Sequence, residues 1–356
     1  MKNRTAPLLF VIVVFCFASC ATDVRVYSGI DNSIQEKDFI KGVELIDKAQ
    51  SGSKPVYPKK NIILLYLDRG LLTHYAGMYD RSTDDMGQAE RLIEEAYTKS
   101  ISAGIASYIL NDNTKDYAGE DYENIYLNVF NGLNYYHLGS IDDALVETRR
   151  INEKLRILAT KYDKINQDMR ERYDGSLSGV SIPPAKPVNF SNSALADYLG
   201  VLFYRTDGLQ DDARINLLQL RDAFATSPNV YYNPIPSALV LSGEQGSETA
   251  EELALPENEA RVNLVCFTGL SPIKEEEDIK FLLPFPYGPG YAHLRLPTLV
   301  SRSDTVTSIR VEVGGGEEFE LELLEDMGMA IRETYNARYS NIFLKTLIRT
   351  ITKYVA

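Results

Sequence analysis

The chain has 356 residues, a length that suggests about two domains. Hydrophobic residues make up 44% and charged residues 24%. These are values of a folded globular protein, and they exclude wholesale disorder. The formal net charge of -13 argues against nucleic acid as a general partner, because phosphate binding needs a basic surface. Three cysteines cannot form a disulfide framework.

The first twenty residues predict an export signal. A short positive segment precedes residues 8–17, a run of about ten apolar residues that is too short to span a hydrocarbon core of roughly 30 Å. Small residues then stand directly before Cys20. This pattern resembles the bacterial lipoprotein signal, which implies cleavage of residues 1–19 and acylation of Cys20. The alternative is an ordinary secretory signal with an incidental cysteine.

A lipid on Cys20 would fix the location of the protein. Two or three acyl chains hold a soluble body at a bilayer, since each buried methylene contributes about 0.8 kcal/mol. Ala21 follows Cys20 where an aspartate would, by resemblance, favour retention in the inner membrane. We therefore expect an outer-membrane lipoprotein that faces the periplasm, with residues 20–32 as its tether. Apart from this covalent lipid, such as palmitate, no cofactor is expected.

Residues 33–240 predict a helical domain with tetratricopeptide-like repeats. Such repeats are helix pairs of about 34 residues, in which small residues and an aromatic precede a turn glycine and an alanine follows it. Two stretches have this spacing, and a third has it in part: Gly132, Tyr135, Gly139 and Ala144; Tyr204, Gly208, Ala213, Leu217 and Leu220; and Leu67, Gly70, Gly77 and Ala89. In the third, Thr73 and Ser82 replace the aromatic and the alanine. A generic helical bundle with coincidental spacing is the alternative.

A polar segment, residues 109–123, separates two of these stretches. Its spacing does not fit a calcium loop, because Tyr117 stands where the sharp-turn glycine belongs. The segment is explained by Asp and Asn side chains that cap the next helix, or by a surface that recognises a partner. The candidate partner-binding residues are Asp112, Asn113, Asp116, Tyr117 and Glu120, together with Tyr135 and Tyr204 of the repeat region.

Several of these stretches resemble an uncharacterised family of bacterial tetratricopeptide-like envelope lipoproteins. The resemblance lies in residues 111–123, 131–138 and 144–152, and extends to 211–214, 269–274 and the C-terminal helix. Members of this family are often encoded beside curli-export-type and penicillin-binding-protein-activator-type lipoproteins. The resemblance implies an envelope scaffold or assembly factor and does not imply an enzymatic activity. We expect the partner to be another outer-membrane lipoprotein.

The C-terminal part, residues 255–356, predicts a small α+β domain. Residues 262–267 are apolar on both faces, as in a central strand, so Cys266 is expected to be a buried structural thiol. Residues 309–313 and 319–323 alternate around Gly314–Gly316, which predicts a hairpin with one buried face. The proline-rich residues 284–291 are expected to connect elements without regular structure. Two helices are expected to close the chain.

A basic row lies on the last of these helices. Lys345, Arg349 and Lys353 follow each other at intervals of four. We expect a solvated face or pairing with the glutamates of the hairpin, Glu317, Glu318, Glu320 and Glu322. The alternative is contact with an anionic ligand such as a lipid head group.

The sequence offers little catalytic chemistry. Ser271 and Lys274 match a Ser-x-x-Lys motif, but the further elements that this chemistry needs are absent or in the wrong order. The histidines His74, His137 and His293 are isolated, the first two are expected to be packed or at the surface, and no metal site is expected.

Two functional hypotheses remain. The first is a non-enzymatic scaffold or adaptor that binds protein partners in envelope assembly or export, since helical repeats bind extended partners along one groove. The second is an enzyme or binding module that acts on cell-wall or envelope polysaccharide. It would use Asp112, Asp116, Glu120 or Glu123 as acid and base.

Overall fold

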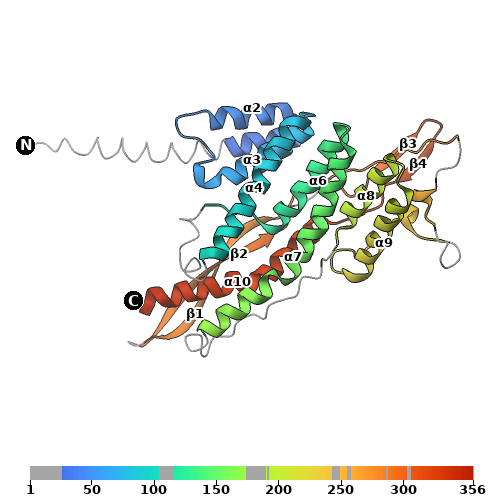
Figure 1. Cartoon of the computed structure of the whole chain (residues 1–356). Coiled ribbons are helices and arrows are strands. Elements are labelled where there is room, and N and C mark those ends of the chain that lie inside the picture. Colours follow the sequence, from blue (N-terminus) through green and yellow to red (C-terminus); the bar gives the residue numbers. More distant parts are fainter. Residues whose placement is uncertain are drawn as a thin grey trace, which may run out of the picture. The chain divides into compact units, whose positions relative to one another are not determined.

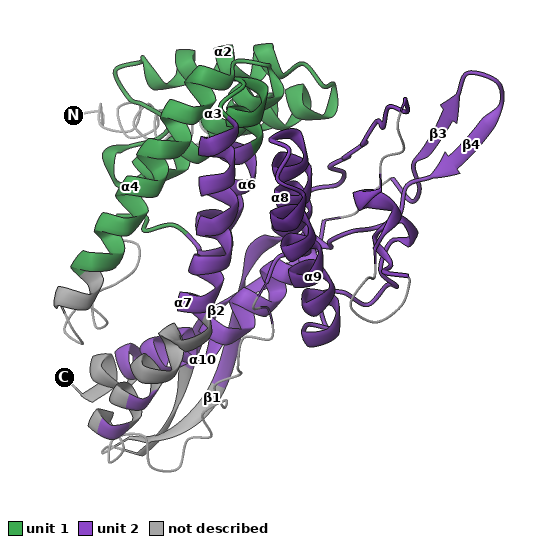
Figure 2. Cartoon of the chain, turned by 45° about the vertical axis from the view of Figure 1, so that its right-hand side comes forward, with its two compact units in different colours: residues 1–101, 112–119, 133–140 green, residues 102–111, 120–132, 141–356 purple. Residues whose placement is uncertain are grey.

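The computed structural model describes residues 26–103, 116–173, 190, 192–242, 249–254, 258–285, 288–302 and 306–355. The signal residues 1–19, Cys20, Asp112 and Asn113 lie outside these residues. The described chain is mainly helical and carries two small two-stranded sheets in its C-terminal region (Figure 1). It forms two compact units: residues 1–101, 112–119 and 133–140 belong to unit 1, and the remaining residues to unit 2 (Figure 2).

Unit 1 is a set of short helices around an apolar core. A helix over residues 26–35 is followed by α2 (Phe39–Gln50), the 3-10 turn η1 (Lys59–Asn61), α3 (Ile62–Tyr75) and α4 (Tyr79–Ala103). Asp38 begins α2 because its side chain accepts a hydrogen bond from the backbone N–H of Lys41. The buried core consists of Ile30, Val43, Ile46, Tyr57, Leu65 and Leu72.

Small residues bring α3 and α4 together. A Cβ atom on Gly70 would lie 3.2 Å from the Met86 side chain, so glycine permits the close approach. The Ser82 hydroxyl donates to the Gly70 carbonyl at 2.7 Å. Beside this contact, Arg69 forms a two-pronged ion pair with the buried Asp85, with contacts of 2.8 and 2.6 Å. The two helices are therefore joined by both shape and charge.

Unit 2 contains most of the longer helices. Its helical part comprises residues 120–132, which include the start of α6 (Asp121–His137), then α7 (Ile141–Tyr173), α8 (Ala194–Thr206) and α9 (Gln210–Thr226). The 3-10 turns η4 (Ser237–Leu239) and η5 (Glu251–Leu253) follow. The largest fully buried side chains in this part are Leu145, Ile151, Leu155, Phe190, Leu199, Phe203, Leu217 and Leu220.

A buried polar seam joins α6 to α7. The Lys154 ammonium donates to the side-chain oxygen of Asn128 at 2.6 Å, and the Asn128 amide donates to Glu147 at 2.5 Å. Asn128 is fully buried and Glu147 nearly so. Because buried polar groups are costly unless they are paired, this seam fixes which face of α7 meets α6.

The turn glycines expected from the sequence end α3, α6 and α8. Gly77, Gly139 and Gly208 adopt φ values of 74°, 77° and 77°. At Gly208, its N–H bonds to the Arg205 carbonyl, and the next N–H bonds to the Tyr204 carbonyl. The same pair of bonds recurs at the other two turns, so each helix ends in a left-handed glycine cap. The predicted helix pairs are confirmed, whereas their tetratricopeptide-like character stays a prediction.

The C-terminal region holds two antiparallel hairpins and one long helix. Strand β1 (Ile273–Phe285) pairs with β2 (Gly288–Val300) in the register Ile279 to Leu294. Strand β3 (Arg310–Val313) pairs with β4 (Glu317–Glu320). The helix α10 (Met327–Val355) lies on β2, where its Leu344, Leu347 and Ile348 pack against Leu294 and Leu296.

Four expectations for this region were wrong. Residues 262–267 are extended but belong to no strand, and Val262 is exposed. The hairpin around Gly314–Gly316 forms as predicted, but none of its apolar residues is buried: Ile309, Val311 and Leu321 are half-buried, and Val313, Phe319 and Leu323 are exposed. Within residues 284–291, residues 284–285 and 288–291 form strands. The chain closes with one continuous helix, because Met327–Val355 contains no proline or cap that would divide it.

Gly119 offers a test of local geometry in unit 1. Its φ is 80°, and a Cβ atom there would lie 2.8 Å from the Ile93 side chain. Gly208 has a similar φ of 77° with open space around it, so it serves as the control. We expect Gly208→Ala to lower the free energy of unfolding by about 1 kcal/mol through backbone strain alone. Gly119→Ala should cost about 1–2 kcal/mol more. Urea denaturation measures both, and equal losses would contradict the crowding at Gly119.

Candidate functional site

The carboxylate of Glu325, directly before α10, accepts four hydrogen bonds. Its Oε1 accepts a hydrogen bond from the Tyr126 hydroxyl at 2.6 Å. Its Oε2 accepts from the Tyr231 hydroxyl at 2.7 Å, the Ser193 hydroxyl at 2.9 Å and the Leu195 N–H at 3.2 Å. One carboxylate therefore binds α6, the beginning of α8, the loop after α9 and the beginning of α10.

This arrangement has a structural rather than a reactive character. Ser193 caps α8 through the Ala196 N–H, and the negative Glu325 lies at the same helix N-terminus, where the helix dipole favours an anion. Burial first, and then the charge of Glu325, raise the pKa of the Tyr126 and Tyr231 hydroxyls above the ordinary value. Both phenols therefore stay protonated and remain hydrogen-bond donors.

A buried carboxyl, that of Asp197, lies on α8. Asp197 is 1% exposed, and its Oδ1 accepts a hydrogen bond from the Asn152 amide of α7 at 2.8 Å. Its Oδ2 has no hydrogen-bond partner among the described residues. Burial raises the pKa of Asp197 to about 7, more than the bond to Asn152 lowers it. The protein therefore holds an acid that titrates near neutral pH.

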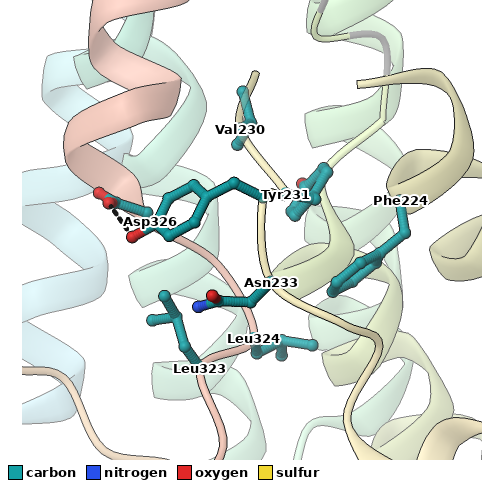
Figure 3. Close-up of a pocket in the computed structure, with 8 residues that line it drawn as sticks. Phe224, Val230, Tyr231, Asn233, Leu323, Leu324 and Asp326 are labelled. Atoms are coloured by element: carbon teal, nitrogen blue, oxygen red, sulfur yellow. Dashed lines mark hydrogen bonds between the residues drawn. The ribbon is translucent and has the colours of Figure 1, made fainter. Parts of the chain in front are cut away.

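Beside this cluster, aromatic side chains line a small pocket (Figure 3). Phe224 stacks on Tyr231 with ring centroids 4.7 Å apart. The Tyr232 hydroxyl donates to Asp326 at 3.0 Å, a bond that the close-up marks (Figure 3). The enclosed space is only about 10 Å³, about the volume that one water molecule needs.

A more open hollow of about 340 Å³ adjoins this pocket. Its lining consists of Arg221, Phe224, Ala225, Tyr231, Asn233 and Ile235. The volume is at the lower end of small-ligand sites. Arg221 is the only charged side chain in this lining, so the hollow favours an anionic over a cationic group.

Glu120, a predicted partner-binding residue and a possible acid or base, lies in an ion-pair network. Its Oε1 contacts the Lys274 ammonium of β1 at 2.6 Å, and its Oε2 contacts the Arg338 guanidinium of α10 at 2.7 Å. Its side chain is 11% exposed. The network also holds the lysine of the Ser271-to-Lys274 motif, while the Ser271 carbonyl accepts from Arg302 at 2.7 Å.

The other predicted site residues that the structure describes belong to different units. In unit 1, Asp116 is exposed, the Tyr117 N–H bonds to the Lys60 carbonyl at 2.7 Å, and Tyr135 is half-buried. In unit 2, the half-buried Tyr204 accepts a long hydrogen bond of 3.3 Å from Arg149. These residues are thus divided between the two units, and of them only Asp116 and Tyr117 are consecutive in the chain.

The basic row on α10 is less exposed than expected. Lys345 and Arg349 are half-buried, and the side chain of Lys353 lies outside the described residues. Two of the histidines behave as predicted. His74 is buried and bonds to Asn134 at 2.7 Å, with a pKa lowered by burial, and His137 stacks on Tyr79.

Residues 261–267, of which 262–267 were predicted to form a central strand, are an extended segment outside any sheet. Alternate side chains fasten it to the helical part of unit 2. Arg261 donates to the carbonyls of Glu252 and Ala254 at 2.7 and 2.8 Å. The Asn263 amide donates to Glu252 at 2.8 Å and to the Tyr198 hydroxyl of α8 at 2.9 Å.

The same alternation continues to the end of the segment. Phe267 packs on Phe130 of α6 with ring centroids 5.3 Å apart. The residues between these contacts face outward: Val262 is 82% exposed, Leu264 is 49% exposed, and Cys266 is exposed as well. The expectation that Cys266 is buried was therefore wrong, because no second layer covers this face of the segment among the described residues.

Comparison with protein-family models, with curated proteins and with solved structures found no match. Within the residues that the structure describes, every helix is too short or too polar to cross a bilayer. In the same residues, no three histidine, cysteine or acidic side chains gather in a way that could hold a metal ion.

The role of Glu325 is testable by an isosteric change. Glu325→Gln keeps the shape of the side chain but removes its charge. It also replaces one acceptor oxygen by an NH₂ group, which cannot accept hydrogen bonds from the hydroxyl and N–H donors around it. We expect the free energy of unfolding to fall by about 2–3 kcal/mol, because hydrogen bonds to a charged group are lost. The control is Asp326→Asn, which should be nearly neutral because asparagine also caps a helix and Tyr232 is exposed. Equal midpoints in urea denaturation for the two variants would contradict this role.

Asp197 makes stability depend on pH. Its folded pKa of about 7 lies above the unfolded value of about 3.9, so the folded chain holds the extra proton between these values. The contribution of Asp197 to the free energy of unfolding is therefore fully present below about pH 4. It decreases as the pH rises from about 4 to about 7. We expect Asp197→Asn to match the unchanged protein near pH 4 and to exceed it above pH 7 by a few kcal/mol.

The measurement is the urea midpoint of both proteins across this range. Asp207→Asn, at an exposed aspartate that follows the last residue of the same helix, is the control and should keep the pH dependence of the unchanged protein. Parallel profiles for Asp197→Asn and the unchanged protein would show that Asp197 titrates normally.

Proposed function

We propose that the chain is a lipid-anchored adaptor of the outer membrane that faces the periplasm and binds another envelope protein. The signal pattern that ends at Cys20 supports the anchor. The single observation that carries the binding role is the outward face of residues 261–267. Val262 is the most exposed large apolar side chain among the described residues, and Leu264 lies on the same side.

The fixed backbone of this segment favours a role in binding a partner over incidental exposure of apolar side chains. Exposed apolar area costs about 25 cal/mol per Å², and scattered apolar residues on flexible loops are common. Here Arg261, Asn263 and Phe267 hold the backbone in place, so the apolar row is preorganised. Preorganisation lowers the entropy lost on binding, which favours a role in partner contact.

The rival function, a carboxylate-dependent enzyme acting on envelope polysaccharide, has less support. Both oxygens of Glu120 contact cations, and this pairing restricts the side chain, which is 11% exposed. A general acid or base needs access to its substrate. Glu325, the other well-connected carboxylate, already accepts four hydrogen bonds.

The proposal is tested by photo-crosslinking in the native envelope. A photoreactive residue in place of Val262 should capture another outer-membrane lipoprotein. The same residue in place of Gln219, exposed on α9, is the control and should capture much less. Cys20→Ser should release the chain from the membrane fraction and lower the capture, because the lipid concentrates the two proteins at one surface.

Two outcomes would contradict this proposal. One is equal capture from Val262 and Gln219. The other is a chain whose Cys20 carries no lipid by mass spectrometry. Loss of cell-wall turnover on substitution of Asp112 and Asp116, with capture unchanged, would instead support the rival.

A further inference from the structure

The backbone of residues 261–267 carries an inference about the form of the partner. The segment is extended and fastened, yet no backbone hydrogen bond joins it to any other described residue. Backbone N–H and C=O groups almost always find partners, either in the chain, in water or in another molecule. An extended backbone with unpaired groups along its sides is the template to which a further strand adds.

The side chains of the segment agree with this reading. Residues 262–267 read Val-Asn-Leu-Val-Cys-Phe and contain neither a charge nor a proline. Proteins usually protect open strand edges with charged residues or proline. In this chain β1 has such protection, since Glu275, Glu276, Glu277 and Asp278 follow each other along it and are exposed. Residues 262–267 lack the charged residues that protect β1.

We propose that residues 261–267 bind an extended strand of a partner protein by β-augmentation, an inference that rests on the proposed adaptor function. The row of unpaired backbone groups calls for an occupant that offers donors and acceptors in a matching row. An extended polypeptide does this, whereas a helix satisfies its own backbone groups and a lipid tail has none.

The outward side chains define the sequence of that strand. Val262 and Leu264 project on one side at a period of two. Cross-strand neighbours stabilise a sheet when apolar side chains oppose each other. The partner strand therefore carries apolar, preferably β-branched, residues at alternate positions. Gly269, with a φ of 76°, turns the chain away and limits the paired length.

The test uses the full-length chain in detergent and a designed peptide. The peptide is capped and has nine residues, with valine at alternate positions, threonine between them and lysine at both ends. Hydrogen exchange read by mass spectrometry reports on the amides of residues 262–266. We expect fast exchange in the free chain and at least about tenfold slower exchange with the peptide at about 1 mM.

Two controls separate strand pairing from general apolar contact. A peptide N-methylated at its central nitrogens keeps its side chains but donates no backbone hydrogen bond, and it should leave the exchange unchanged. Val262→Ser and Leu264→Ser should each weaken peptide binding about tenfold. Ile215→Ser, at a 51% exposed residue of α9, is the matched variant that should not weaken it.

Several results would overturn this inference. Slow exchange at residues 262–266 in the free monomer would show that the chain covers the segment itself. Slow exchange that appears only as the chain dimerises would assign the segment to a second copy. No slowing at about 1 mM peptide, or equal slowing by the methylated peptide, would exclude strand pairing. Specific capture from Val262 in the envelope would then leave the adaptor function intact with another binding mode.

Discussion

The hydrogen bonds to Glu325 are the constraint on which unit 2 depends. Four donors, from α6, the first turn of α8 and the loop after α9, meet on one carboxylate that directly precedes α10. Because a single charge satisfies all of them, none of these elements can shift without leaving a buried donor unpaired. The first turn of α8, the aromatic pocket beside Tyr231 and the start of α10 are thus positioned together.

Side-chain contacts also fix the conformation of residues 261–267, although these residues form no backbone hydrogen bonds with a neighbouring strand. Their support comes from side chains: Asn263 reaches Tyr198 of α8, and Phe267 lies on Phe130 of α6. The ion pair between Arg205 and Glu252 lies beside Asn263 and orients its amide. A rigid helical body can therefore present an extended segment whose own backbone groups remain available.

The sequence predicted the parts of the fold that have local causes. The helix pairs and their turn glycines follow from spacing, and the hairpin around Gly314–Gly316 follows from alternation and turn residues. The β1–β2 hairpin was missed because the acidic residues 275–278 erase the alternation that marks a strand. Glu325 could not be found because its partners lie 94 to 199 residues away. The strand predicted at residues 262–267 failed for the same reason, since pairing depends on a distant neighbour and not on propensity.

The charge along β1 has a consequence for crowded conditions. A two-stranded ribbon of thirteen residue pairs has two long borders along which identical molecules could join into growing fibres. When two such ribbons approach through β1, their rows of glutamate and aspartate meet and repel each other. This repulsion therefore opposes edge-to-edge association through β1, even at a high local concentration of the protein.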